Sequence, residues 1–213
     1  MKRNPFLKIL SVAVFFTLTS CLGLSIDIET QRSGSGKINM EYRISGGIEN
    51  IGRLDGNERW SILAVGRADW ERTAARIDGM KLASFSSRER GDETLTSVTL
   101  EYESAEVLLA FLDPNGVSTR FPGCKLAFLL IDPVSEYLDR DLAALMMQAF
   151  DGYKFSMSFS GDASSSISFF DGTLKEIPPP PGCEIVSSGR KVSFNIDMSR
   201  LLSMTNGFGI CIR

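Results

Sequence analysis

The segment YKFSMSFS, residues 153–160, alternates apolar and polar side chains without a break. Its apolar side chains are all large: Tyr153, Phe155, Met157 and Phe159. A period of two is typical of a β-strand that buries one face and exposes the other. The segment therefore predicts a half-buried strand in a sheet with an apolar inner face.

The same alternation predicts three β-hairpins, each with a glycine in its turn: residues 24–45, 80–102 and 184–197. Further strands are expected over residues 125–131, as a continuous apolar run, over 167–170, and over 208–212, as another alternating strand.

Helices are expected where capping residues precede apolar residues at helical spacing. Asp69 and Ser104 are the predicted N-caps of two short helices. The longest helix is expected over Ser135–Phe150, with a wide apolar stripe. Since strands and helices mix without regular βαβ alternation, the predicted class is α+β. We expect mainly antiparallel sheet built of hairpins, with two or three helices packed on one face.

The first 21 residues predict a bacterial lipoprotein signal. Lys2, Arg3 and Lys8 give a basic start, an apolar run follows over Ile9–Leu18, and Leu18-Thr19-Ser20-Cys21 has the layout of a lipobox. Small residues before Cys21 let the peptide lie extended in a peptidase groove, and the thiol is the nucleophile that accepts a diacylglyceryl group. Residues 1–20 are thus the expected signal peptide, and Cys21 the expected lipidation site. Two or three acyl chains, palmitate among them, hold a protein at a membrane far more firmly than one.

Two other interpretations of this leader were weighed. Simple secretory cleavage calls for an A-x-A-like end, which Leu18-Thr19-Ser20 matches poorly. A transmembrane helix needs about 20 apolar residues, roughly twice the run over Ile9–Leu18. The lipoprotein interpretation places residues 21–213 in the cell envelope, on the exported side of either the inner or the outer membrane. These residues are expected to form a single α+β domain, with sub-lobes at residues 24–114 and 119–213 as a variant.

Charge argues against nucleic acid as a partner. Without Lys2, Arg3 and Lys8, 20 of the 23 basic residues remain against 26 acidic ones, a net charge of −6. Such a surface repels phosphate backbones, and no cluster of basic residues offsets it. No segment after Cys21 is apolar enough to span a bilayer, so the expected membrane contact is the lipid on Cys21.

Three cysteines follow Cys21. Cys124 and Cys183 each end a Pro-Gly-Cys turn just before a strand, which suggests equivalent sheet-edge positions and a possible disulfide between them. Buried free thiols are the alternative, since free cysteine is among the most buried residue types. No metal site or other cofactor is expected, because the chain has no histidine and no CxxC pair.

Signs of catalysis are sparse. Without histidine the commonest general base is absent, and no nucleophile-elbow, P-loop or dinucleotide-binding motif occurs. Paired carboxylates can hydrolyse glycosides without histidine, and the acids that lie near one another are Glu101 with Glu103, and Asp132 with Asp139 and Asp141. A solvated strand face and a charged helix start explain these acids equally well. We therefore expect no enzyme, and a carboxylate-based hydrolase is the weakest alternative.

An apolar binding surface is the stronger candidate. The predicted helix and the strand after it carry methionine and aromatic side chains, which suit a greasy ligand. The candidate lining residues are Leu142, Met146, Phe150, Phe155 and Met157. Ordinary core packing explains the same spacing.

Several segments resemble the LppM-like family of membrane-anchored bacterial lipoproteins. The similar features are the lipobox Leu18–Cys21, the hairpin Ile26–Ile44 with its Gly-Lys-Ile step, the strand Tyr153–Gly161, and the hairpin from Gly189 to Phe194 before Asp197. The resemblance implies an α+β fold with lipid-binding character and no catalytic residues.

Two functions follow as hypotheses. The first is a membrane-anchored envelope lipoprotein of binding type, for a lipid or another apolar ligand. The second is a structural or assembly lipoprotein that contacts other envelope proteins through exposed sheet edges.

Overall fold

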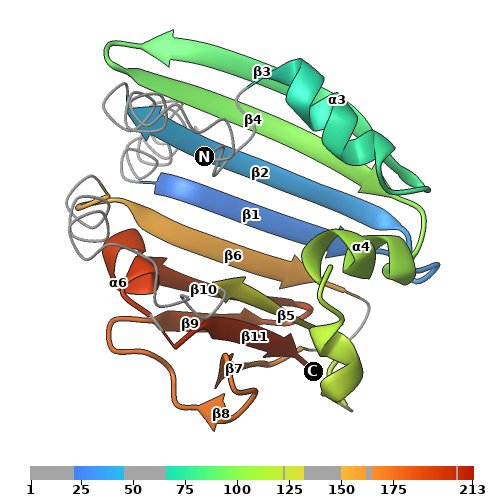
Figure 1. Ribbon diagram of the computed structural model, residues 1–213, viewed down its shortest axis with the longest axis vertical. Coiled ribbons are helices and arrows are strands. Elements are labelled where there is room, and N and C mark those ends of the chain that lie inside the picture. The colour runs from blue at the N-terminus through green and yellow to red at the C-terminus, as the bar shows by residue number, and fades with distance from the viewer. Residues whose placement is uncertain (1–21, 46–65, 122, 132–149, 162–164, 205) are drawn as a thin grey trace, which may run out of the picture.

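The computed structural model describes residues 22–45, 66–121, 123–131, 150–161, 165–204 and 206–213. Within these residues the chain forms two β-sheets and three short helices (Figure 1). The sheets are mainly antiparallel, so the α+β class predicted from the sequence is confirmed.

The larger sheet has seven strands in the order β3-β4-β2-β1-β6-β10-β9. Their bounds are β1 Leu22–Thr30, β2 Gly36–Ser45, β3 Met80–Arg90, β4 Glu93–Tyr102, β6 Lys154–Ser160, β9 Glu184–Ser188 and β10 Lys191–Asp197. The three predicted hairpins are confirmed as β1–β2, β3–β4 and β9–β10. Only β1 and β6 pair in parallel within this sheet, and this pair joins strands from the two predicted sub-lobes.

The inner face of the larger sheet is apolar across its central strands. Ile26 of β1 lies beside Met40 on β2 and beside Met157 on β6, and Met157 lies beside Phe194 on β10. Ile28 and Phe159 form the next row and are both buried. Because each strand has a period of two, the rows stay in phase across strands that are far apart in the sequence.

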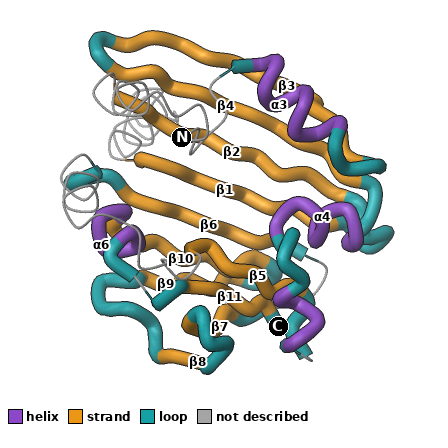
Figure 2. The backbone as a smooth tube through the Cα atoms, in the orientation of Figure 1, coloured by secondary structure: helices purple, strands orange, loops and turns teal. Residues whose placement is uncertain are grey.

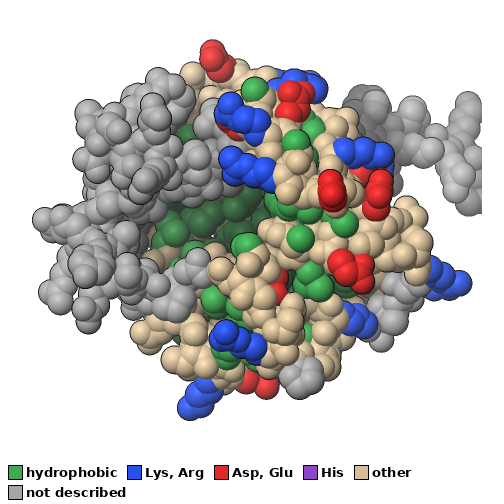
Figure 3. Space-filling view, turned by 45° about the vertical axis from the view of Figure 1, so that its right-hand side comes forward, with side chains coloured by type: hydrophobic (Ala, Val, Ile, Leu, Met, Phe, Trp, Pro, Cys, Tyr) green, Lys and Arg blue, Asp and Glu red, His purple; other side chains and the backbone are tan. Residues whose placement is uncertain are grey.

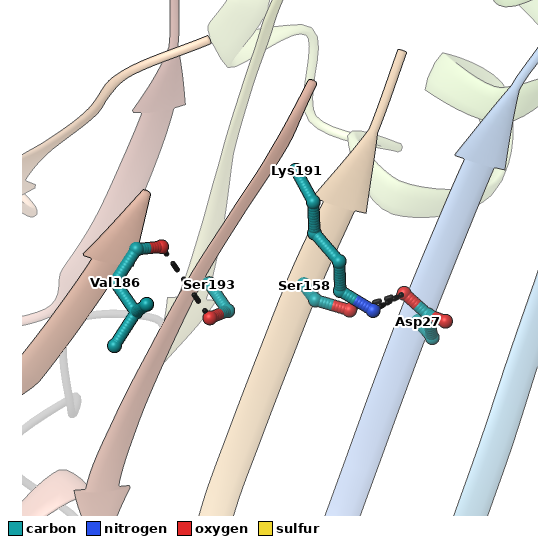
Figure 4. A network of polar contacts seen from close by, with 5 residues as sticks. All are labelled: Asp27, Ser158, Val186, Lys191 and Ser193. Carbon is teal, nitrogen blue, oxygen red and sulfur yellow. Dashed lines mark hydrogen bonds and ion pairs between the residues drawn. The ribbon is translucent and has the colours of Figure 1, made fainter. Parts of the chain in front are cut away.

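The outer face carries small polar and charged side chains instead. Asp27 accepts hydrogen bonds from Ser158 and from Lys191 Nζ, the latter at 3.2 Å (Figure 4). On the same face Thr99 donates to Asn39 at 3.1 Å. This face is therefore held by polar cross-strand contacts, which suit a surface in contact with water.

The smaller sheet has four strands in the order β5-β11-β7-β8. Their bounds are β5 Leu126–Ile131, β7 Ile167–Asp171, β8 Glu176–Ile177 and β11 Phe208–Ile212. The strand predicted over residues 208–212 is confirmed as β11, but all five of its residues are buried, so its alternation marks no exposed face. The reason is that β11 is a central strand with apolar residues on both sides. Phe208 and Ile210 join the core shared with the larger sheet, whereas Cys211 joins a second cluster with Val117.

The helices α3 (Arg67–Ala75), α4 (Ala105–Leu112) and α6 (Met198–Leu202) lie against the inner side of the larger sheet (Figure 2). Trp70 of α3 is buried, and its Nε1 donates to the Tyr42 hydroxyl at 3.0 Å. The N-cap of α3 is Gly66, three residues before the predicted one, and Asp69 accepts from the Gly66 N–H at 3.1 Å.

Of the predicted helix Ser135–Phe150, all but Phe150 lies outside the described residues. The longest helix among the described residues, α3, has nine residues, whereas a helix that spans a bilayer needs about 20.

Cys124 forms a disulfide with Cys211, with 5.6 Å between the Cα atoms. Cys183, the possible partner that the sequence suggested, is not in this bridge. Cys124 stands just before β5, and the next residue, Lys125, donates its N–H to the Ile212 carbonyl at 2.6 Å. The chain thus enters β5 directly beside Cys211 of the neighbouring strand. Cys183 precedes β9 in the other sheet and is a free, half-buried thiol. The two Pro-Gly-Cys turns are alike locally but lead into different sheets.

Replacing Cys124 by serine should lower the free energy of unfolding by about 2–5 kcal/mol, because the bridge closes a long loop of 87 residues. Urea unfolding followed by tryptophan fluorescence measures the change. Cys183→Ser is the matched control and should cost about 1 kcal/mol or less. Equal losses in the two variants would show that the Cys124–Cys211 bridge adds no stability.

Candidate functional site

A pocket of about 290 Å³ lies at one end of the larger sheet. Its walls come from the β1–β2 turn, α4, the start of β5, the end of β6 and the segment that follows β6. The described residues that line it are Thr30, Gln31, Arg32, Gly34, Ala105, Leu108, Leu109, Lys125, Leu126, Phe159, Gly161 and Ser165. Four separate stretches of the sequence therefore converge on one cavity, the end of β6 and the segment after it forming one of them.

Helix α4 supplies one apolar wall. Ser104 caps the helix as predicted, and its Oγ accepts from the Val107 N–H at 3.4 Å. Ala105, Leu108 and Leu109 are spaced so that they share one face of the helix. Leu108 is buried and Leu109 is half-buried, so this face runs from the core to the pocket.

The inner part of the pocket is formed by two strands. Phe159 of β6 and Leu126 of β5 both line it, and their exposed fractions are 6% and 2%. Phe159 belongs to the alternating segment that predicted the sheet and lies beside Ile28 of β1. The pocket therefore ends on the same apolar face that forms the core.

The β1–β2 turn is held in place by a buried tyrosine. The Tyr102 hydroxyl lies 2.7 Å from Thr30 Oγ1 and donates to the Glu29 carbonyl at 2.9 Å. Burial raises the pKa of Tyr102, and the nearby Glu29 carboxylate adds to this while the Thr30 hydrogen bond opposes it. Gly36 makes the approach possible, since a Cβ there would stand 1.9 Å from the Glu29 carbonyl oxygen. The turn that carries Gln31 and Arg32 is thus fixed beside α4.

Positive charge borders the pocket. Arg32 and Lys125 both line it and are exposed, and Lys125 Nζ donates to Ser165 Oγ at 3.3 Å. Neither aspartate nor glutamate is among the described lining residues. An apolar interior beside two cations suits a molecule with an apolar part and an anionic group.

Hydrophobic side chains also gather in a hollow near the middle of the face seen in Figure 3. The inner face of the larger sheet has half-buried apolar residues among its central strands, including Leu24, Ile26 and Ile44. Apolar surface on this side of the molecule thus extends beyond the pocket at the sheet end.

The structure places the sequence-predicted lining residues in different environments. Phe155 and Met157 are each 2% exposed, and the Phe155 ring centroid lies 5.7 Å from that of Phe194. Both belong to the packed core and do not line the pocket. Phe150 is half-buried and packs edge-on to Tyr153. Leu142, Met146 and the predicted lipidation site Cys21 lie outside the described residues.

Sequence reasoning did not single out the pocket. Phe159 lies on the predicted apolar stripe, but Leu108, Leu109 and Leu126 come from other elements, and no local pattern relates them. The signals that were present are the Ser104 cap, which orients α4, and the glycines of the β1–β2 turn.

The residues weighed for catalysis do not form a cleft among the described residues. Glu101 accepts from Lys37 at 3.0 Å and lies 3.6 Å from Lys81, and the hydrogen bond from Lys37 lowers the pKa of Glu101. Glu103 is exposed beyond the end of β4, while Asp132, Asp139 and Asp141 lie outside the described residues.

The free cysteine is a poor nucleophile. Burial raises the pKa of the Cys183 thiol, and the nearby Glu184 carboxylate raises it further by a smaller amount, so less of the reactive thiolate is present. No group of acidic or cysteine side chains in the described part could hold a metal ion.

No protein-family model matches this chain, and no curated protein matches it.

Phe155→Asp should abolish cooperative folding, because it buries an unpaired carboxylate beside Phe194 at a cost of several kcal/mol. Lys154→Asp introduces the same side chain one residue earlier, at an exposed position, and should cost about 1 kcal/mol or less. Thermal melting followed by circular dichroism compares the two. A Phe155→Asp protein that melts near the parent temperature would contradict the buried position of this residue.

Proposed function

We propose that this protein is a membrane-anchored envelope lipoprotein that binds an anionic amphiphile, such as a fatty acid, in the pocket beside α4. The observation that carries the proposal is the pairing of apolar walls, from Leu108, Leu109 and Phe159, with the cations Arg32 and Lys125.

The apolar walls would supply most of the affinity. Burying one methylene group is worth about 0.8 kcal/mol, so even a short stretch of acyl chain gains several kcal/mol. The volume of about 290 Å³ stands at the lower end of the usual range for ligand pockets, roughly 300–1,000 Å³. A single chain therefore fits the pocket better than a lipid with two.

The cations would set the orientation of the ligand. Arg32 and Lys125 are exposed, and exposed ion pairs contribute only about 0–1 kcal/mol. Their effect is to favour a carboxylate or phosphate over a neutral group at the pocket mouth.

The side chains that line the pocket favour binding over catalysis. Among the described lining residues the hydroxyl groups are those of Thr30 and Ser165, and the amine beside Ser165 belongs to the exposed Lys125. A lysine that activates a serine needs a desolvated amine, which an exposed position does not provide.

Two observations support the envelope location. The leader has the charge, length and lipobox of a lipoprotein signal. The Cys124–Cys211 disulfide is consistent with a compartment outside the cytoplasm, because disulfides persist in oxidising environments.

Fluorescently labelled dodecanoic acid should bind the full-length protein, and Ala105→Phe should weaken this binding roughly tenfold, the equivalent of about two buried methylene groups. The new ring would occupy the space between α4 and Phe159. Ala110→Phe is the matched control, since Ala110 is an exposed residue of the same helix and does not line the pocket.

Lys125→Glu should weaken binding of the labelled acid a few-fold and leave binding of the corresponding labelled alcohol unchanged. Lys175→Glu, at another exposed lysine, should change neither. The pocket proposal fails if neither probe binds the parent protein, or if Ala105→Phe and Ala110→Phe lose affinity equally.

Radiolabelled palmitate should enter the full-length protein in a bacterial host and should not enter Cys21→Ala, because the thiol is the atom that takes the lipid. Cys183→Ala is the control and should label like the parent. Label that persists in Cys21→Ala, or that never enters the parent, would refute the anchor while leaving the pocket proposal standing.

A further inference from the structure

The two edges of the larger sheet are protected to different degrees. At one edge, β3 carries charged side chains at Lys81, Arg88, Glu89 and Arg90. At the other edge, β9 carries a single charge, Glu184, at its start. Charged side chains on an edge strand discourage pairing with another chain. Of the two edges, β9 is therefore the one at which a strand of another chain can pair.

Exposed apolar side chains concentrate on β9. Among the described residues, the large hydrophobic side chains that are exposed are Leu95, Ile185 and Val186, with exposed fractions of 41%, 38% and 55%. Two of the three are adjacent on β9, where they point to opposite faces of the sheet. All five residues of the strand are exposed, and no described strand pairs with its outer edge.

The hairpin register shows which backbone groups face outward. Gly189 and Arg190 form a two-residue turn, with Gly189 at φ +60° as hairpin turns require, and Ser188 lies opposite Lys191. The residues that flank such a turn form a hydrogen-bonded pair, and these pairs alternate along an antiparallel ladder. Ser188 and Val186 thus bond to β10, whereas the N–H and C=O groups of Ile185 and Ser187 point away from it.

We propose that β9 pairs antiparallel with β9 of a second copy of this chain, about a two-fold axis that passes beside Val186. The outward groups of Ile185 and Ser187 stand symmetrically on either side of Val186, so each copy offers the same donors and acceptors to the other. A two-fold contact requires such self-complementarity.

Side-chain sizes and charges match in this register. Each Ile185 lies opposite the partner's Ser187, and each Val186 lies opposite the partner's Val186. Glu184 lies opposite the partner's Ser188, a small residue, with the partner's Lys191 next on the same face of the sheet. Lys191 Nζ pairs with Asp27 of its own chain, so no like charges face one another across the contact. The match that favours a second copy over an unrelated strand is Val186, the most exposed large hydrophobic side chain among the described residues, which would cover its own copy. The contact joins two sheets into one and gives the chain an assembly role besides ligand binding.

The proposal predicts a position-specific disulfide. In the full-length chain with Cys183→Ser, Val186→Cys places two thiols in a non-hydrogen-bonded pair, where Cα atoms lie about 4.5 Å apart. Ser188→Cys, on the same strand and face, places them four residues apart along the strands, roughly 14 Å. This exceeds the limit of about 7 Å for a disulfide. Oxidation in intact cells, followed by non-reducing electrophoresis, should trap a Val186→Cys dimer several-fold more efficiently than a Ser188→Cys dimer.

A second variant tests the backbone contact. Ser187→Pro removes an N–H that points outward, which an edge strand tolerates, so the monomer should melt near the parent temperature. Combined with Val186→Cys it should abolish the cross-linked dimer. Equal trapping at positions 186 and 188, trapping that survives Ser187→Pro, or a Val186→Cys adduct with a different protein would each overturn the second-copy proposal. These readouts do not depend on ligand binding at α4.

Discussion

The parallel pairing of β1 with β6 is the constraint on which the rest of the structure depends. Asp27 and Ser158, which meet across this pair, are 131 residues apart in the chain. Closing so long a loop costs conformational entropy, and burial of Ile28 and Phe159 in one continuous row offsets that cost. Without this pair, the β3-β4-β2-β1 and β6-β10-β9 groups would each expose a further edge and half of an apolar face.

The pocket is a consequence of the same pair. Since β1 and β6 run parallel, the β1–β2 turn emerges at the end of the sheet where β6 finishes at Ser160, between the lining residues Phe159 and Gly161. The Tyr102 hydroxyl ties this turn to β4, and only two residues separate the end of β4 from the start of α4. An antiparallel β6 would carry the opposite end of that strand to this place, and the aromatic floor of the pocket would be lost.

The two faces of the larger sheet lead to different roles. Its inner face is wide and apolar, so it must be covered. The smaller sheet and the three helices pack against it and form one hydrophobic core with it. The outer face is held by polar side chains such as Asp27, Asn39 and Ser158 and needs none. Surface available for partners therefore lies at the edges of the sheet, where β9 contrasts with the charged strand β3.

The sequence by itself determined the local elements. Period-two alternation located the three hairpins, and Ser104 located the start of α4, because these features depend on residues that are close in the chain. Alternation also identified the buried side of β6, including Phe155 and Met157. Tertiary structure alone decided how the hairpins and the remaining strands lie beside one another. It placed β1 next to β6, gave Cys124 the partner Cys211, and buried both sides of β11. The physical reason is that periodicity shows which side of a strand is buried, whereas the pairing of distant strands depends on contacts between segments far apart in the chain. The pocket is built from four separate stretches of the chain, so it too was decided by tertiary structure.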